Sequence, residues 1–321
     1  MQLAIRVDAS PNMGFGHLSR CNALAEHALE LGWQVSVFSL YPLANKCDPR
    51  IAFIQSSSEF DLSDAIRRKA PDWLLLDNYL LGGIAGKVYA DIACRKAFID
   101  DLFTGCDANI DLVISPAGAA EEKRLVGLYP DAKRLLGYSY SLLSSRFRCA
   151  RTAYTQRSRV LITFGGSDVA GLTVPVVSAL VHAGVTGVDV VITDAMGHSE
   201  LVFPGVQVHQ NLNPMQMADL QGKAAVAISA AGGTIFELAC CGVPSVICVV
   251  ADNQLQAASE FAANPGYEVV DCRGVPHIGE IADAYQRLQH SSARRVVHDA
   301  AINMVDGLGC KRVLEAMSQY E

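Results

Sequence analysis

Four residues near the start of the chain have types and spacings that suit chemistry on a bound ligand. Gly14, Gly16, His17 and Arg20 come directly after the strand-like run 3–8. Glycine lets the backbone approach a ligand closely, and the free N–H groups of a following helix attract anions. His17 and Arg20 are three residues apart, so both side chains can face one ligand. The segment predicts a ligand site that contains a titratable base, with a capping or packed histidine as the alternative for His17.

A second group of polar side chains, Asp77–Tyr79, follows a run of three leucines. In open α/β sheets the ligand-facing residues lie at the carboxyl ends of the strands. Asp77 can orient His17 or a water molecule, and Tyr79 can close over a sugar. The pair Asp100–Asp101 occupies the equivalent place one strand further on, where acidic residues are more often solvated or capping.

Two further glycine turns follow apolar runs in the second half of the chain. The turn Gly165–Asp168 follows the run 159–164, and the turn Gly232–Thr234 follows the run 225–229. Glycines and the N–H groups of a first helical turn can hold a diphosphate without a lysine. An ordinary tight turn between strand and helix explains the first turn equally well. The nucleotide-binding candidates are Gly165, Gly166, Ser167, Gly232, Gly233 and Thr234.

Polar side chains follow the second of these turns. Glu237 lies three residues after Thr234, so its carboxylate could accept hydrogen bonds from both hydroxyls of a ribose. The alternative is a glutamate that completes a capping box. Asn253 and Gln254 carry amides that suit the hydroxyl and acetamido groups of a sugar. A helix cap by Asp252 is the alternative for that segment.

The composition bounds the class of protein. The chain has 321 residues, of which 50% are hydrophobic and 18% are charged, which is enough for a sizeable core and two domains. A net charge of −7 without extended basic blocks argues against nucleic acids and acidic membrane surfaces as partners. A small molecule is the expected partner.

Cysteine usage and the first residues indicate the compartment. The ten cysteines form no CxxC pair and lie mostly in apolar runs, which is typical of reduced cytosol. No clustered Cys and His spacing indicates a metal site. The chain enters its first strand without a leader, and no apolar run reaches the ~20 residues that span a bilayer. The sequence predicts a cytoplasmic protein without metal or cofactor.

Strand-like and helix-like segments alternate along the chain and must position these residues. Short apolar runs separated by helices predict parallel sheets that are covered on both faces. Weak periodicity between 138 and 157 indicates a domain boundary near residue 155. We expect an α/β protein with two Rossmann-like domains, 1–155 and 156–321, facing each other across a cleft, and final helices that could pack back on the first domain. The expected strands are 35–40, 73–76, 97–99, 112–114, 159–164, 188–193, 206–210, 225–229 and 245–250, and the expected helices include 20–31, 61–69, 85–94, 173–183 and the segment 279–321.

Taken in order, these motifs resemble one known family. They are Arg6-x-Asp8, Gly14-x-Gly16-His17-x-x-Arg20, Asp77-Asn78-Tyr79, Gly165–Asp168, Thr234-x-x-Glu237 and Asp252–Gln254. The set resembles the UDP-sugar hydrolases of pseudaminic acid biosynthesis, members of the glycosyltransferase B-type superfamily. They are similar to the transferase that adds N-acetylglucosamine to lipid-linked muramyl pentapeptide. Val169 and Asn78 depart from the family pattern, which has proline at the first position and, in many members, histidine at the second.

The resemblance implies a metal-independent, inverting hydrolysis of UDP-2,4-diacetamido-2,4,6-trideoxy-β-L-altropyranose. Water attacks the anomeric carbon, the C–O bond breaks and UDP leaves, in a route that serves flagellin glycosylation. His17 is implied as the general base and Glu237 as the ribose ligand. The other implied substrate contacts are Asp8, Gly14, Gly16, Arg20, Asp77, Tyr79, Asn253 and Gln254. An inverting UDP-sugar glycosyltransferase and a non-enzymatic nucleotide-sugar binding protein remain the alternatives.

Overall fold

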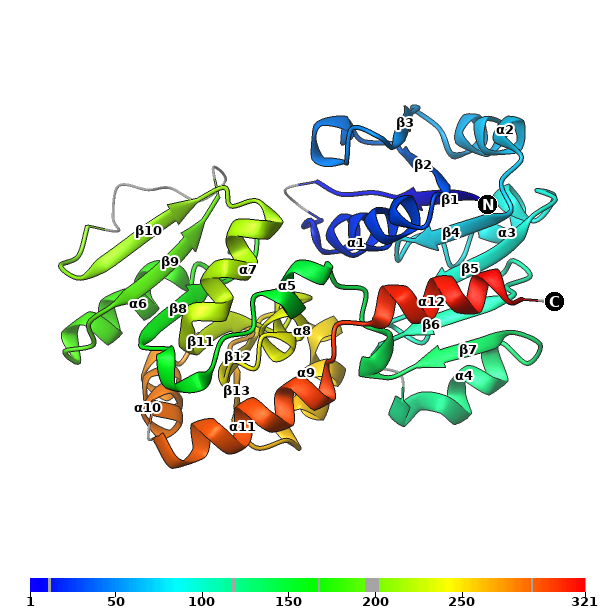
Figure 1. Cartoon of the computed structure of the whole chain (residues 1–321). Coiled ribbons are helices and arrows are strands. Elements are labelled where there is room, and N and C mark those ends of the chain that lie inside the picture. Colours follow the sequence, from blue (N-terminus) through cyan, green and yellow to red (C-terminus); the bar gives the residue numbers. More distant parts are fainter. Residues whose placement is uncertain (11–12, 117–118, 167, 194–201, 290, 321) are drawn as a thin grey trace. The chain divides into compact units, whose positions relative to one another are not determined.

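The chain folds into two compact units. A computed structural model describes residues 1–10, 13–116, 119–166, 168–193, 202–289 and 291–320 (Figure 1). Unit 1 consists of Met1–Ser144 together with Leu308–Glu321, and unit 2 consists of Ser145–Gly307. The first unit thus ends ahead of the boundary expected near residue 155, and the chain returns to it after completing the second.

Unit 1 is built on a parallel sheet of seven strands among the described residues, in the order β3-β2-β1-β4-β5-β6-β7. The strands are β1 Gln2–Val7, β2 Gln34–Ser39, β3 Ala52–Gln55, β4 Trp73–Asp77, β5 Arg95–Ile99, β6 Leu112–Ser115 and β7 Lys133–Leu136. The connecting helices are α1 Gly16–Glu30, α2 Glu59–Lys69, α3 Ala85–Tyr89 and α4 Glu122–Leu128.

Unit 2 repeats this plan with six parallel strands in its described part, in the order β10-β9-β8-β11-β12-β13. The strands are β8 Arg159–Thr163, β9 Val188–Ile192, β10 Val206–Gln210, β11 Ala224–Ala230, β12 Ser245–Val249 and β13 Tyr267–Asp271. The helices are α5 Ser145–Cys149, α6 Thr173–His182, α7 Pro214–Lys223, α8 Thr234–Cys240, α9 Leu255–Ala262, α10 Ile278–Gln289 and α11 Ser291–Met304, and a 3₁₀ turn covers Asp252–Gln254.

The strand order reverses direction once in each sheet. In unit 1 the reversal lies between β1 and β4, and in unit 2 it lies between β8 and β11. In a doubly wound sheet, ligands bind outside the carboxyl ends of the strands at such a reversal. The glycine turns follow β1, β8 and β11, and Asp77 is the last residue of β4, so the topology places these candidates at the strand reversal of their unit.

The sequence explains which strands lie inside and which lie at the edges. β4 and β12 are buried along their whole length and consist of nearly continuous apolar residues, as strands covered on both faces require. The strands β3, β7 and β13 were not expected from the sequence. They lie at sheet edges and are only partly buried, so they lack the continuous apolar run that indicates a central strand.

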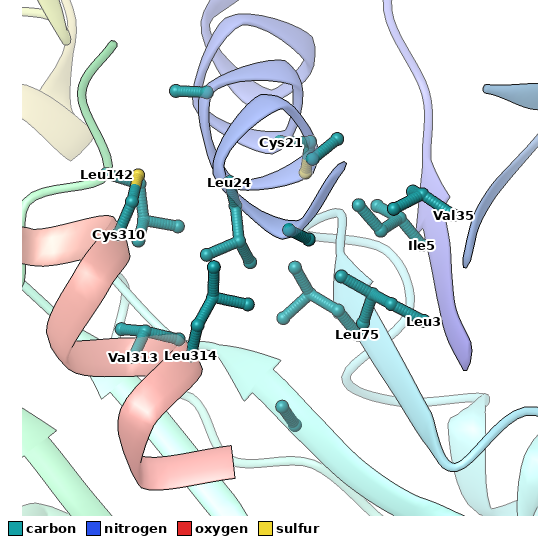
Figure 2. Packing of buried hydrophobic residues seen from close by; sticks show 14 of the residues in the cluster. Leu3, Ile5, Cys21, Leu24, Val35, Leu75, Leu142, Cys310, Val313 and Leu314 are labelled. Carbon is teal, nitrogen blue, oxygen red and sulfur yellow. The ribbon is translucent and has the colours of Figure 1, made fainter. Parts of the chain in front are cut away.

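The last helix, α12 Gly309–Ser318, belongs to the core of unit 1. Figure 2 shows Leu314 of α12 and Leu24 of α1 pointing toward one another within this core. The indole Nε1 of Trp73 on β4 also donates a hydrogen bond of 3.2 Å to the carbonyl oxygen of Met317. The final helix therefore closes one face of the sheet that carries Asp77.

Candidate active site

The carboxylate of Asp77 is the centre of a hydrogen-bonded group in unit 1. Asp77 ends β4 and is fully buried. Its Oδ1 accepts from His17 Nδ1 at 2.6 Å and from Arg20 Nη2 at 2.5 Å. Its Oδ2 accepts from Arg20 Nε at 2.7 Å and from the thiol of Cys21 at 3.3 Å. The first turns of α1 and the end of β4 meet at the strand reversal, which brings these side chains together.

The contact between His17 Nδ1 and Asp77 Oδ1 favours one tautomer of His17. An ionised carboxylate only accepts hydrogen bonds, so a hydrogen on Nδ1 and a lone pair on Nε2 match this short contact, and Arg20 Nη2 lies further from Nδ1, at 3.0 Å. The ring of Tyr79 stands edge-on to the imidazole, with ring centroids 4.5 Å apart and an angle of 81° between the planes. The imidazole is 12% exposed. Of the two roles expected for Asp77, the structure contains the one in which it orients His17.

Arg20 connects Asp77 to a second acid. Its Nη1 donates to Asp101, which follows β5. Burial alone would raise the pKa of Asp77, but the Arg20 guanidinium and His17 hold that pKa well below its ordinary value. Asp77 is therefore ionised at neutral pH. Arg20 was expected as a substrate contact, and the structure shows its guanidinium bound to both acids.

The glycine turn before α1 has two different glycines. Gly14 adopts a φ of +80° and donates from its backbone N–H to the carbonyl oxygen of Ser10 at 2.8 Å, so the turn itself requires it. Gly16 begins α1 with an ordinary φ, and a Cβ added there would meet no atom within 4 Å. Among the described residues, no neighbouring atom requires a glycine at position 16. The backbone beside His17 is therefore accessible to a ligand.

Asp8 was expected to contact the substrate, but it is only 3% exposed. Its Oδ2 accepts from Arg6 at 2.7 Å and from Asn78 at 2.9 Å. Its Oδ1 accepts from the hydroxyl of Ser39 and the N–H of Leu40, both at 2.9 Å. This geometry favours a positioning role, because Asp8 fixes the residue that links Asp77 to Tyr79.

In unit 2 the two glycine turns lie at the strand reversal, as the topology requires. Gly165 has a φ of +76°, and the carbonyl oxygen of Gly166 accepts from the hydroxyl of Thr193 at 2.6 Å. Ser167, the third candidate of this turn, lies outside the described residues. A Cβ added at Gly232 or Gly233 would meet nothing within 4 Å, and neither residue has a positive φ. These two glycines, like Gly16, leave backbone accessible to a ligand.

Glu237 is held by a residue that sequence reasoning missed. The side chain of Gln221 on α7 donates from Nε2 to Glu237 Oε2 at 3.0 Å. Burial raises the pKa of Glu237 to about 7, and the hydrogen bond from Gln221 offsets only part of that effect. α8 has Gly233 at its N-cap and no side-chain cap, so Glu237 does not complete a capping box. A partly buried carboxylate that titrates near neutrality is a common feature of functional sites.

The remaining candidates follow β12. Gln254 Oε1 accepts from the N–H of Val250 at 2.9 Å, which fixes the 3₁₀ turn Asp252–Gln254, while Asn253 is exposed. Asp252 is bound by Arg273 Nη1 at 2.6 Å and does not cap a helix. The structure therefore presents the Asn253 amide at the carboxyl edge of the unit 2 sheet.

Two partners were not identified from the sequence. Asp101 was considered more typical of a solvated or capping residue, and its neighbour Asp100 does cap a loop, accepting from Thr104 and Gly105. The position after a neighbouring strand was the only signal for Asp101. Gln221 lies in the last turn of α7 and has no motif around it that could have identified it.

Among the described residues, no group of three or more His, Cys, Asp or Glu side chains is arranged to hold a metal ion. No helix in the same part of the chain has the length and apolar character needed to cross a bilayer.

The chain is similar in sequence to proteins whose names include a UDP-sugar hydrolase. No sequence profile of a known protein family matches the chain. The chain is 26% identical over 271 residues to the Helicobacter pylori pseudaminic acid cytidylyltransferase and UDP-2,4-diacetamido-2,4,6-trideoxy-β-L-altropyranose hydrolase, an alignment that covers 81% of this chain and 47% of that protein. It is 23% identical over 187 residues to the Campylobacter jejuni UDP-2,4-diacetamido-2,4,6-trideoxy-β-L-altropyranose hydrolase, covering 56% and 66%. The chain thus spans about half the length of the H. pylori protein.

Solved structures with a similar fold superimpose on nearly the whole chain. Acinetobacter baumannii MurG superimposes with a TM-score of 0.63 at 14% identity, covering 99% of each chain. The calicheamicin glycosyltransferase superimposes with a TM-score of 0.63 at 15% identity, covering 99% of this chain and 98% of that one. The chain therefore has the glycosyltransferase B-type fold and is similar in sequence to proteins named as UDP-2,4-diacetamido-2,4,6-trideoxy-β-L-altropyranose hydrolases.

Proposed function

We propose that this protein is a cytoplasmic hydrolase that cleaves a UDP-linked 2,4-diacetamido-2,4,6-trideoxyhexose at its anomeric C–O bond, with inversion and without a metal. The observation that carries the proposal is the 2.6 Å contact between His17 Nδ1 and Asp77 Oδ1. It directs the lone pair of a neutral imidazole to Nε2, the form that a general base needs. The names of the relatives supply the substrate class.

In the proposed reaction, His17 Nε2 removes a proton from water while the water oxygen attacks the anomeric carbon. The bond from that carbon to the β-phosphate oxygen breaks, and UDP leaves with the electron pair. Asp77 stabilises the imidazolium that forms, because its carboxylate is ionised and already bound to Nδ1. Tyr79 fixes the imidazole from its edge and contributes a partly exposed ring for the sugar.

Unit 2 is proposed to bind the nucleotide. The accessible backbone at Gly232 and Gly233 would lie against the diphosphate, together with the turn at Gly165 and Gly166. Glu237 would accept hydrogen bonds from the ribose hydroxyls, with Gln221 keeping the carboxylate in place. Asn253 and Gln254 would meet the acetamido groups or the phosphate. The product would be a free sugar for pseudaminic acid biosynthesis and thereby for flagellin glycosylation.

The main alternative is an inverting UDP-sugar glycosyltransferase, because the similar solved structures include a glycosyltransferase. In that case His17 would remove a proton from an acceptor hydroxyl. A nucleotide-sugar binding protein without catalysis is the third possibility. These functions differ in what the purified protein does with the UDP-sugar alone.

The test is incubation of the pure protein with UDP-2,4-diacetamido-2,4,6-trideoxy-β-L-altropyranose in H₂¹⁸O. UDP release without any acceptor, ¹⁸O on the anomeric carbon and initial formation of the inverted anomer by NMR are the expected results. Release that requires an added acceptor would establish a transferase, and binding without release would establish a sensor. Label in UDP would mean that the P–O bond breaks, which would contradict the proposed mechanism.

A further inference from the structure

We propose that Arg20, paired on its far side with Asp101, is a positioning residue that sets both the tautomer and the charge of His17 through the Asp77 carboxylate. The inference rests on the proposed role of His17 as a base, and it adds two residues that no sequence motif assigns to that role. We call His17, Arg20, Asp77 and Asp101 the base cluster.

The tautomer depends on how Asp77 is held. Arg20 binds the carboxylate in a bidentate manner, with Nε on Oδ2 at 2.7 Å and Nη2 on Oδ1 at 2.5 Å. This fork fixes the plane of the carboxylate, so Oδ1 stays directed at His17 Nδ1, 2.6 Å away. The Cys21 thiol reaches Oδ2 at 3.3 Å, so both oxygens are held. Without the fork, the carboxylate could rotate and Nδ1 could lose its acceptor.

The charge of His17 depends on a balance around it. The buried Asp77 carboxylate attracts a proton to the imidazole. Arg20 Nη2 lies 3.0 Å from His17 Nδ1, and its positive charge opposes protonation. A neutral imidazole can act as a base, whereas an imidazolium cannot. Arg20 thus opposes the pull of the same carboxylate that orients the ring.

Asp101 also affects the charge of His17, because it binds the end of Arg20 that does not contact Asp77. It binds Arg20 Nη1, and it is 21% exposed, so solvent screens part of its effect. Among the described residues, the charged and titratable groups that face the His17–Asp77 pair are Arg20 and Cys21 on α1, Tyr79 in the loop after β4, and Asp101 after β5. Removal of Arg20 and removal of Asp101 should therefore shift the protonation of the His17–Asp77 pair in opposite directions.

The experiment is an NMR pH titration of the free, full-length protein labelled with ¹⁵N-histidine. The His17 signals are assigned by their loss in His17→Asn. In the wild-type protein the high-pH spectrum should show hydrogen on Nδ1. Arg20→Gln should raise the midpoint of the His17–Asp77 titration by about one pH unit, because an uncompensated carboxylate near a base has effects of this size. Asp101→Asn should lower the midpoint by a smaller amount.

Conservative and control variants separate positioning from charge. Arg20→Lys should leave the midpoint close to that of the wild type but weaken the Nδ1–H preference, because it keeps the charge and loses the fork. Arg67→Gln and Asp64→Asn alter an exposed ion pair on α2 and should leave His17 unchanged. Equal midpoints in all variants, shifts of the same sign for Arg20→Gln and Asp101→Asn, or hydrogen on Nε2 would overturn the proposal.

The NMR titration tests the role of the base cluster without requiring that the protein hydrolyse a UDP-sugar. If the midpoints shift as expected but no UDP-sugar is hydrolysed, the proposed function fails and the role of the base cluster stands. If His17-dependent hydrolysis occurs without such shifts, only the positioning role fails. Should Arg20→Gln not fold, Asp101→Asn and Arg20→Lys still decide the result. In an active enzyme, the acidic limb of the kcat/KM profile should move with the NMR midpoint.

Discussion

Gln221 on α7 donates a hydrogen bond of 3.0 Å from Nε2 to Oε2 of Glu237 on α8. The contact occupies one oxygen of a carboxylate whose pKa burial raises to about 7. Glu237 is therefore held in place by a neutral amide, and among the described residues no basic partner fixes its charge in the way that Arg20 fixes that of Asp77. Two predictions depend on this difference.

The first concerns nucleotide affinity. Glu237→Gln keeps a side chain of the same shape but removes the charged acceptor for the ribose hydroxyls. UDP binding should weaken by about 1–3 kcal/mol, measured by calorimetry at pH 8. Deoxyribose analogues of UDP should lose little further affinity in the variant. Unchanged affinity for UDP would remove Glu237 from the nucleotide site.

The second concerns stability of the ligand-free protein as a function of pH. The folded-state pKa of Glu237 is about 7, above the ordinary value of 4.5, so the folded protein binds this proton more tightly than the unfolded chain does. Its contribution to stability is complete below about pH 4.5 and is lost as pH rises to about 7, by at most about 3 kcal/mol. The free energy of unfolding of the wild type should fall relative to Glu237→Gln between pH 5 and pH 8. A constant difference between the two proteins would contradict the raised pKa.

A third prediction separates ligand contact from folding at a glycine. Gly233 has φ −56° and ψ −27°, which alanine adopts readily, and its Cβ would meet nothing within 4 Å. Gly233→Ala should therefore raise stability by roughly 0.4–1 kcal/mol. It should weaken UDP binding roughly tenfold, because an added methyl would overpack against the diphosphate. Gly279→Ala in α10 is the matched control, with equal open space and unchanged UDP affinity expected.

The fourth prediction tests the base. His17→Asn should keep the fold and UDP binding but lose ~10²–10⁴ in kcat, which is the usual contribution of a positioned acid or base. The measurement is UDP release under saturating substrate, with thermal unfolding as the check on folding. Turnover near that of the wild type would exclude His17 from the mechanism.

The fifth prediction is that hydrolysis survives excess chelator. The proposed diphosphate contacts are backbone N–H groups, which stabilise developing negative charge without an ion. Activity should be the same before and after dialysis against EDTA, and added magnesium should not increase it. Loss on chelation with recovery on magnesium or manganese would require an ion at the diphosphate.

The sequence was informative where one strand end brings several polar types together. His17, Asp77 and Tyr79 were expected at neighbouring strand ends, and the parallel sheet of unit 1 places them in contact. Apolar runs also indicated the central strands, since burial on both faces requires them. The glycosyltransferase B-type fold expected from the ordered motifs is confirmed by the solved structures that superimpose on the chain.

The remaining features depend on geometry that a residue pattern does not encode. Two adjacent acids follow β5, and only the structure distinguishes Asp100, which caps a loop, from Asp101, which binds Arg20. Gln221 reaches Glu237 because α7 and α8 pack together in unit 2. Arg20 was assigned to the substrate because it lies one helical turn from His17 and could face the same ligand, but two carboxylates already bind it. Such choices are settled by tertiary packing.

The return of α12 to unit 1 has a consequence for biosynthesis. A ribosome makes the strands of unit 1 first, then the whole of unit 2, and only afterwards the helix whose Val313 and Leu314 complete the first core. One apolar face of the unit 1 sheet, the face that α12 covers, therefore stays exposed while the ribosome makes about half of the chain. Trp73, which is bonded to α12, offers a fluorescent report of the moment when that face is closed.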